Sequence, residues 1–374
     1  LIADMFGDAP CSQAALVDEN GSPVYLTPKM DKQEEIYTQA MQYLDDAIAD
    51  LQKEDLIDPG AQDLLYQGDA EKWLKLAYGL KARYTMHLLK RSANKDADME
   101  KVLEYVDNSF ESAEEQAAFD VYDANNINPL YGFFVARAGL GASESMRSKL
   151  AEYNDPRLSR AFITKQGASG KEQAPGTADN AVYAPNGTPE QGTSKYGTSL
   201  FMYSISAPTL LLSYHELKFL EAEALCRLER DAKSALKDAV VAGLLNAENS
   251  FTISRKELGK TLINAASSIT EAEAESYFDN TIEAKYTAEP LKTTMIQKYF
   301  ALWGASGEAT ESYNDVRRMK GLGENFIELK NPNSFPLRCP YGNSDTTTNA
   351  EVKAAYGNGQ YVYSENVWWA GGSR

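Results

Sequence analysis

The chain has 374 residues, of which 43% are hydrophobic, and its 54 acidic and 37 basic residues give a net charge of −17. This length allows a large hydrophobic core, as one domain or two. A surface this negative repels phosphate backbones, which argues against nucleic acid as a partner. Cys11, Cys226 and Cys339 are too few for a disulfide framework.

The first part of the chain predicts a turn-rich lead-in followed by helices. Residues 1–30 contain several Gly and Pro residues and no sustained hydrophobic period. Asp31 and Glu34 have the spacing of a capping box, and Asp69 is expected to cap a second helix. Apolar residues then recur at three- and four-residue steps over three predicted helices: 31–53, 70–91 and 99–113.

The stretch Ala207–Arg230 predicts the central helix of the fold. Pro208 suits a first helical turn, because its missing N–H is not needed there. Beyond it, one apolar face is formed by residues at helical spacing: Leu217, Leu220, Ala224 and Leu228. A second helix over 234–246 follows after a short break, so we expect an antiparallel helical hairpin.

Two further capping-box spacings, Ser254–Glu257 and Thr270–Glu273, predict helix starts, and the second opens a helix to about Tyr286. Helices over 291–303 and 306–319 form a third predicted hairpin. Three or more such hairpins with alanine-rich contacts favour an all-α fold of tetratricopeptide-like helical hairpins, with long irregular loops and little sheet.

The sequence contains none of the common catalytic or metal-binding signatures, such as HExxH, CxxC, a Walker loop or GxSxG. His87 and His215 are the only histidines, and we expect both to be packed or solvated helix residues. Asp120, Asp123 and Asn125 could offer oxygen ligands to calcium, but the EF-hand spacing is absent. We predict no catalytic residue, cofactor or metal, although abundant carboxylates leave a glycosidase pair open.

Short motifs follow one another in a fixed order along the chain. They are Gly7-Asp8-Ala9-Pro10, Tyr66-Gln67-Gly68-Asp69 with Trp73, Leu80 to Tyr84, Asn154-Asp155-Pro156-Arg157, Leu212 to Ala224, and Ile296-Gln297-Lys298 with Asp315, Arg317 and Arg318. In this order they resemble the SusD/RagB family of outer-membrane nutrient-binding lipoproteins of Bacteroidetes, and more narrowly its SusD-like subgroup. The chain departs from the family pattern at Cys11, where tyrosine is usual, and at Gly342 and Asp345 near the end.

The resemblance implies a single SusD-like domain over residues 1–374. Its helical scaffold would lie mainly in residues 31–118, 207–246 and 270–319. Its loop-rich, ligand-facing region would lie in residues 120–206 and 320–374. It implies a non-enzymatic protein on the extracellular face of the outer membrane that binds an oligosaccharide and delivers it to a SusC-type TonB-dependent transporter. Family members are lipid-anchored through an N-terminal segment, which we expect to be absent from this chain. No apolar run in the sequence is long enough to span a bilayer.

Aromatic side chains in the loops are the expected ligand contacts, because the C–H face of a sugar stacks on such rings. The candidates are Tyr183, Tyr196, Tyr203, Tyr131, Trp368 and Trp369. Core packing is the competing interpretation for each of them, and the two tryptophans could simply anchor the C-terminus. Two other functions stay open: a peptide-binding or purely protein-interaction scaffold of the same fold, and a carboxylate-pair glycosidase.

Overall fold

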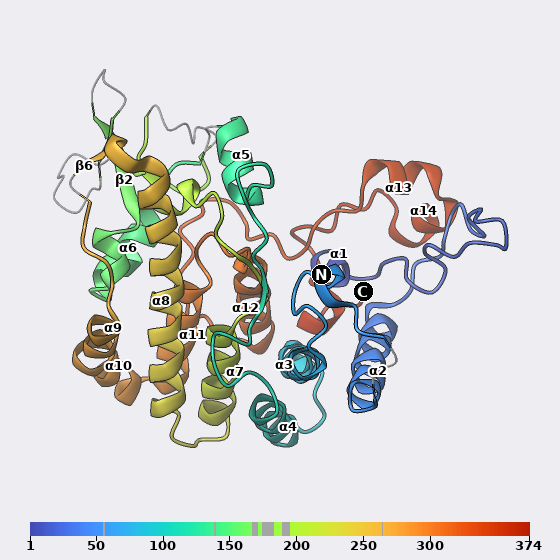
Figure 1. Ribbon diagram of the computed structural model, residues 1–374. Helices are drawn as coiled ribbons and strands as arrows, with labels where there is room; N and C mark the ends of the chain where they lie inside the picture. The colour runs from blue at the N-terminus through green and yellow to red at the C-terminus, as the bar shows by residue number, and fades with distance from the viewer. Residues whose placement is uncertain (55–56, 138–139, 167–170, 174–182, 189–194, 264) are drawn as a thin grey trace.

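Long helices packed side by side form the body of the molecule (Figure 1). The computed structural model describes residues 1–54, 57–137, 140–166, 171–173, 183–188, 195–263 and 265–374. The main helices are α2 (Gln33–Leu51), α3 (Ala70–His87), α4 (Lys95–Asp107), α7 (Tyr214–Arg227), α8 (Lys233–Leu258), α11 (Pro290–Ala301) and α12 (Ala309–Leu322). Each packs on its neighbour, α2 on α3, α3 on α4, α4 on α7, and α7 on both α8 and α11. The predicted all-α fold of paired helices is confirmed.

Two of the predicted helix starts have the expected capping chemistry. The Asp69 carboxylate accepts a hydrogen bond from the backbone N–H of Lys72 at 3.1 Å. The hydroxyl of Thr270 accepts from the backbone N–H of Glu273 at 3.2 Å. Each bond satisfies an N–H that has no partner inside its helix. These starts could therefore be predicted from local sequence alone.

The predicted start at Asp31 is wrong by two residues. Helix α2 begins at Gln33, and Lys32 is its N-cap. The Asp31 carboxylate instead accepts from the backbone N–H groups of Cys11 and Ser12, at 2.9 and 2.8 Å. Because these contacts come from a distant segment, the carboxylate is not available to cap the helix.

The first residues of the predicted central helix form a strand instead. Strand β5 (Thr209–Leu212) pairs antiparallel with β1 (Ala117–Phe119). Along β5 the burial alternates, with Leu210 and Leu212 inside and Leu211 exposed, which is the period of a strand. The helix α7 starts only after this ribbon ends.

The predicted helix over 234–246 is too short, and the predicted helix start at Ser254 is wrong. Helix α8 runs without a break to Leu258, because its buried stripe continues through Phe251. The Ser254 hydroxyl lies inside this helix and donates to the backbone carbonyl of Ser250 at 2.9 Å. A serine can therefore match the sequence pattern of a helix N-cap although it lies inside a helix, where its hydroxyl bonds to the backbone of the preceding turn.

Several short elements complete the fold. The short helices are α1 (Ile2–Phe6), α5 (Pro129–Arg137), α6 (Glu144–Glu152), α9 (Glu271–Tyr277), α10 (Glu283–Ala288), α13 (Asn343–Thr348) and α14 (Ala350–Tyr356). A π-helical turn, Phe278–Ile282, joins α9 to α10 and so interrupts the predicted helix over 270–286. A small sheet has the strand order β4-β2-β3-β6, formed by Thr198–Ser199, Phe162–Gln166, Lys171–Gln173 and Leu262–Ile263. In the described parts of the chain, no helix combines the length and apolar character that a membrane crossing requires.

The two ends of the chain pack against each other (Figure 1). The backbone carbonyl of Met5 accepts from the N–H of Cys339 at 2.7 Å. Asp8, from the Gly-Asp-x-Pro motif, has no exposed surface and accepts from the Tyr356 hydroxyl at 2.6 Å. The Asp8 carboxylate also accepts from the backbone N–H of Gln33 at 2.9 Å. This motif therefore ties the N-terminal segment to both α2 and α14.

Candidate functional site

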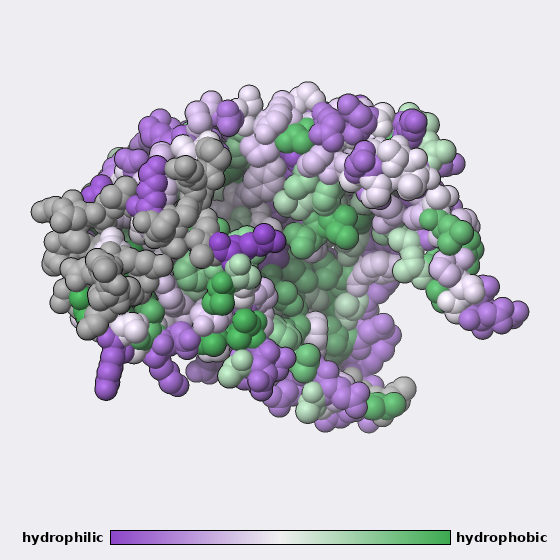
Figure 2. Space-filling view, turned by 90° about the horizontal axis from the view of Figure 1, so that it is seen from above, coloured by the Kyte–Doolittle hydropathy of each residue, from purple (hydrophilic) through white to green (hydrophobic). Residues whose placement is uncertain are grey.

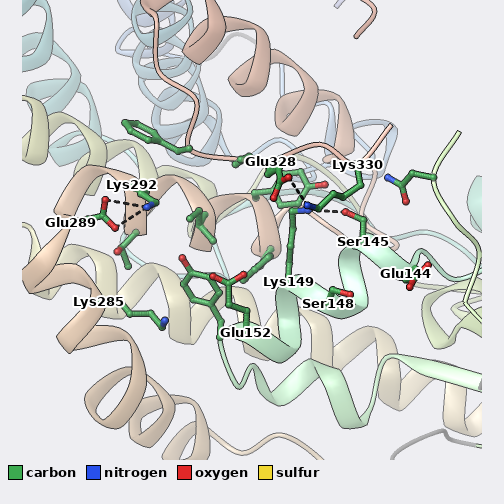
Figure 3. A pocket seen from close by; sticks show the side chains of 18 of the residues that line it. Glu144, Ser145, Ser148, Lys149, Glu152, Lys285, Glu289, Lys292, Glu328 and Lys330 are labelled. Atoms are coloured by element: carbon green, nitrogen blue, oxygen red, sulfur yellow. Dashed lines mark hydrogen bonds and ion pairs between the residues drawn. The ribbon is translucent and has the colours of Figure 1, made fainter. Parts of the chain in front are cut away.

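A cleft of about 780 Å³ opens between α6, α10, α11 and the segment 326–332 (Figure 3). Its walls combine rings, charged side chains and amides. The lining includes Ser145, Lys149, Tyr153, Asn186, Lys285, Lys292, Tyr299, Phe326, Glu328 and Lys330. The volume lies in the range of small-ligand sites.

The apolar part of the cleft consists of rings from three segments. Tyr299 of α11 and Phe326 are each partly exposed, and burial raises the pKa of the Tyr299 hydroxyl. Tyr153, at the end of α6, is largely buried and packs edge-on against Phe300, with ring centroids 5.5 Å apart. Partly exposed rings beside polar groups can stack on a flat C–H face of a ligand.

The charged part of the cleft contains two kinds of lysine. Lys292 forms an ion pair with Glu289 at 2.8 Å, and Lys330 pairs with Glu328. Lys149 instead donates to the Ser145 hydroxyl at 2.7 Å. The Nζ of Lys285 lies 4.4 Å from the centroid of the Tyr153 ring.

The local sequence positions the α6 wall. The Ser143 hydroxyl caps α6 by accepting from the backbone N–H of Met146 at 3.2 Å, and it donates to Asn186 at 3.0 Å. The same residue therefore starts the helix and brings the amide of Asn186 to the cleft rim.

The Asp-Pro-Arg turn after α6 joins the two main walls. Asp155 accepts two hydrogen bonds from the Arg157 guanidinium, at 2.8 and 2.6 Å, and both side chains are buried. Arg157 also donates to the backbone carbonyl of Phe300 in α11 at 2.7 Å. This turn holds α6 against α11 and contributes no group to the cleft itself.

All four predicted ligand-binding tyrosines lie outside the cleft lining. Tyr183 packs edge-on against Phe162 at 5.3 Å, under the guanidinium of Arg147. Tyr196 is only 8% exposed. Of these tyrosines, Tyr183 is nearest in sequence to the cleft, because Pro185 and Asn186 line its rim.

Tyr131 lies on α5 and Tyr203 ends the 3-10 helix Leu200–Tyr203, and these two helices pack on each other at the top of the helical body (Figure 1). The Tyr203 ring packs edge-on against Phe134 at 5.2 Å. The Tyr131 hydroxyl donates to Glu257 at 3.0 Å. The structure thus brings these two predicted residues to one region. Figure 2 shows this upper face of the molecule, with a hollow whose walls carry hydrophobic residues.

Trp368 and Trp369 lie in the C-terminal segment, against α2, α3 and α12. Trp369 has no exposed surface, and its ring stacks on His87 with centroids 5.5 Å apart. Trp368 is partly buried, with the Arg91 guanidinium 5.0 Å from its ring centroid. In this arrangement the pair fastens the chain end to the helical body.

The two histidines and the Asp123 loop lie apart from the cleft. His87 is buried between Tyr37 and Glu311, at 2.9 and 2.8 Å, and His215 lies 3.2 Å from Glu308. Neither histidine lines the cleft. The Asp123 carboxylate is engaged within its own loop, where it accepts from backbone N–H groups. No group of three His, Cys, Asp or Glu side chains suited to a metal ion occurs among the residues that the structure describes.

The cleft rings Tyr153, Tyr299 and Phe326 were missed by the sequence analysis. Tyr299 lies in a helix whose other apolar residues are core residues, so its position gives no separate signal. Phe326 follows α12 in an irregular stretch, far in sequence from Tyr153. Arg157 ties the end of α6 to α11, and Phe326 packs against a cluster that includes Met295 of α11, so the three rings line one cleft only in the folded chain.

Comparison with known proteins identifies the family. The SusD-like family model described as "Starch-binding associating with outer membrane" matches residues 1–341. The chain therefore belongs to the SusD-like family, and the resemblance in the sequence motifs is confirmed. No curated protein matches the chain.

Solved structures agree with this assignment. A SusD/RagB family protein from Bacteroides thetaiotaomicron is 66% identical, with a TM-score of 0.94, over 100% of this chain and 78% of that chain. A chitin-binding SusD homologue from Flavobacterium johnsoniae is 20% identical, with a TM-score of 0.67, over 98% of this chain and 77% of that chain. At that lower identity the likeness shows the fold alone.

Proposed function

We propose that this protein binds an oligosaccharide at the cell surface and passes it to a SusC-type TonB-dependent transporter. The observation that carries the proposal is the match of the starch-binding, outer-membrane-associated family over residues 1–341. A structural relative is named as chitin-binding, which supports carbohydrate as the ligand class.

The cleft beside α6 and α11 is the ligand site in this proposal. Sugars offer C–H faces to aromatic rings and hydroxyls to amides and charged groups. Tyr299 and Phe326 supply partly exposed rings. Asn186 and Ser145, which line the same cleft, supply groups that can form hydrogen bonds. In this proposal the glycosidic bonds of the ligand stay intact, and the protein acts as a receptor without catalysis.

The six residues predicted from sequence remain separate candidates. Tyr203 packs on Phe134 of α5, the helix that also carries Tyr131, and Tyr183 adjoins the cleft rim through Asn186. Tyr196 and Trp369 expose little or no surface, so their rings would have to move before they could touch a ligand. Trp368 has a partly exposed ring.

The proposed location is the extracellular face of the outer membrane, with a lipid anchor in an N-terminal segment. The family description, which associates its members with the outer membrane, supports this location. Co-purification of a tagged protein with a TonB-dependent transporter from solubilised outer membranes tests the partner. Recovery of the protein without any such transporter would contradict it.

Calorimetric titration with a panel of oligosaccharides and peptides tests the ligand class. The proposal predicts saturable binding to at least one oligosaccharide and unchanged sugar chains after hours of incubation. Binding to peptides alone would favour the peptide-binding alternative. Steady release of shorter sugars would instead identify a glycosidase.

A further inference from the structure

The cleft has a charge balance unlike that of the whole protein. Four lysines and four glutamates line it: Lys149, Lys285, Lys292, Lys330, Glu144, Glu152, Glu289 and Glu328. The cleft lining is therefore neutral, whereas the chain has a net charge of −17. A ligand that carries negative charge meets less repulsion in this cleft than over the rest of the surface.

Two of these lysines keep their charge unpaired. Among the described residues, neither Lys149 nor Lys285 has a carboxylate within 4.0 Å, whereas Lys292 and Lys330 are held by the glutamates next to them. The acidic groups nearest to Lys149 act only at longer range, from Glu328 and Glu152. Figure 3 shows Lys149 entering the cleft from α6, and Lys285 from the opposite wall.

The surroundings of Lys149 disfavour the charged form of its side chain. The side chain is partly buried, and desolvation lowers the pKa of its ammonium group below the ordinary value of 10.5. Because the folded pKa lies below the unfolded one, the charged lysine destabilises the fold at neutral pH, and this cost disappears only as the pH approaches 10.5. A neutral side chain such as glutamine would occupy this position without the free-energy cost of desolvating a charge.

The hydrogen bond to Ser145 leaves this pair able to hold an anion. Lys149 donates one proton to the Ser145 oxygen at 2.7 Å, so two ammonium protons and the hydroxyl proton of Ser145 remain to be donated. Three donors from adjacent turns of one helix suit an oxyanion with several acceptor oxygens.

We propose that the oligosaccharide bound in this cleft is acidic, and that a carboxylate or sulfate on one of its sugars pairs with Lys149 and Ser145. This inference rests on the proposed function and narrows its ligand class. A uronic acid and a sulfated sugar share the required chemistry. Lys285, whose Nζ lies over the Tyr153 ring, also lines the cleft and supports the negative charge electrostatically.

Calorimetric titration with four defined oligosaccharides tests the inference. The probes are trigalacturonic acid, a chondroitin sulfate tetrasaccharide, maltotriose and chitotriose. The proteins are wild type, Lys149→Gln, Lys149→Arg and the control Lys353→Gln, which changes an exposed lysine of α14 outside the cleft.

The inference predicts that wild type binds an acidic probe more tightly than either neutral one, and that Lys149→Gln weakens acidic binding about tenfold or more. Lys149→Arg and Lys353→Gln should bind like wild type. The melting temperature of Lys149→Gln should equal or exceed that of wild type, since the partly desolvated charge is gone. Binding to trigalacturonic acid alone or to the sulfated probe alone identifies the anionic group.

Two results would overturn the inference, and they differ in what they say about the proposed function. Equal affinity for neutral and acidic probes, unchanged in Lys149→Gln, rejects the acidic ligand but leaves a sugar-binding protein. Failure of wild type to bind any of these probes or a wider oligosaccharide panel rejects both.

Discussion

Arg318 and Glu223 form a two-pronged ion pair in which neither side chain has any exposed surface. The two guanidinium nitrogens of Arg318 lie 2.5 and 2.7 Å from the two carboxylate oxygens of Glu223. The pair joins α12 to α7, and Arg318 also donates to Asp315, which pairs with Lys298 of α11 at 2.8 Å. Three helices of the scaffold are thus tied by charges at their centre.

The ion pair between Arg318 and Glu223 should be strongly coupled. Removing Arg318 leaves the buried Glu223 carboxylate with Arg227 alone, at 2.8 Å, and Asp315 with Lys298 alone, so Arg318→Ala is expected to lower the free energy of unfolding by about 3 kcal/mol. The double variant Arg318→Met/Glu223→Met should recover most of that loss. Urea denaturation of wild type and these two variants measures both effects. A loss below about 1 kcal/mol in Arg318→Ala would contradict the coupling.

Acid should weaken the turn that precedes α3. Burial tends to raise the pKa of Asp63, but hydrogen bonds from the Gly68 backbone and the Trp73 indole outweigh it and hold the pKa at about 2, against 3.8 ordinarily. A lowered folded pKa gives stability above pH 3.8 that is lost as the pH falls towards 2.

The variant Asp63→Asn isolates this effect. It should lower the free energy of unfolding at pH 7 by about 1 kcal/mol, because the partly exposed carboxylate is screened by solvent. The difference from wild type should shrink as the pH falls from about 4 to about 2. Thermal unfolding followed by tryptophan fluorescence at each pH measures it. A difference that stays constant with pH would show that the carboxylate charge contributes nothing.

The two C-terminal tryptophans should differ in their effect on stability. Trp369 is fully buried between His87 and the Arg317 guanidinium, so Trp369→Ala is expected to cost about 3–5 kcal/mol. Trp368→Ala removes a partly exposed ring and should cost clearly less. Guanidinium denaturation compares the two variants. Equal losses would show that the segment is held by its backbone rather than by the Trp369 ring.

Much of the scaffold could be predicted because its signals are local. The capping bonds of Asp69 and Thr270 depend on residues three positions away, and the helical stripes repeat every three to four residues. The errors occurred where distant contacts compete with local preference. Asp31 binds Cys11 and Ser12 instead of capping α2, and the segment before Tyr214 pairs with a distant strand.

The cleft could not be predicted for the same physical reason. Tyr153, Tyr299 and Phe326 come from three separate segments, and each fits a packed helix or loop when its neighbours alone are considered. The unpaired charge of Lys149 is equally invisible in sequence, since Glu152 is only three residues away and would normally be its partner. Only the folded chain shows which lysines find carboxylates.

The central claim, that sugar binds in the cleft beside α11, is tested most directly by calorimetric titration of Tyr299→Ala with an oligosaccharide that wild type binds. The account predicts about tenfold weaker binding, corresponding to about 1.4 kcal/mol, in a variant that is still folded at the temperature of the titration. Tyr299→Phe, which keeps the ring, and Tyr363→Ala, which removes an exposed ring outside the cleft, should bind like wild type. Unchanged affinity in Tyr299→Ala would contradict the account.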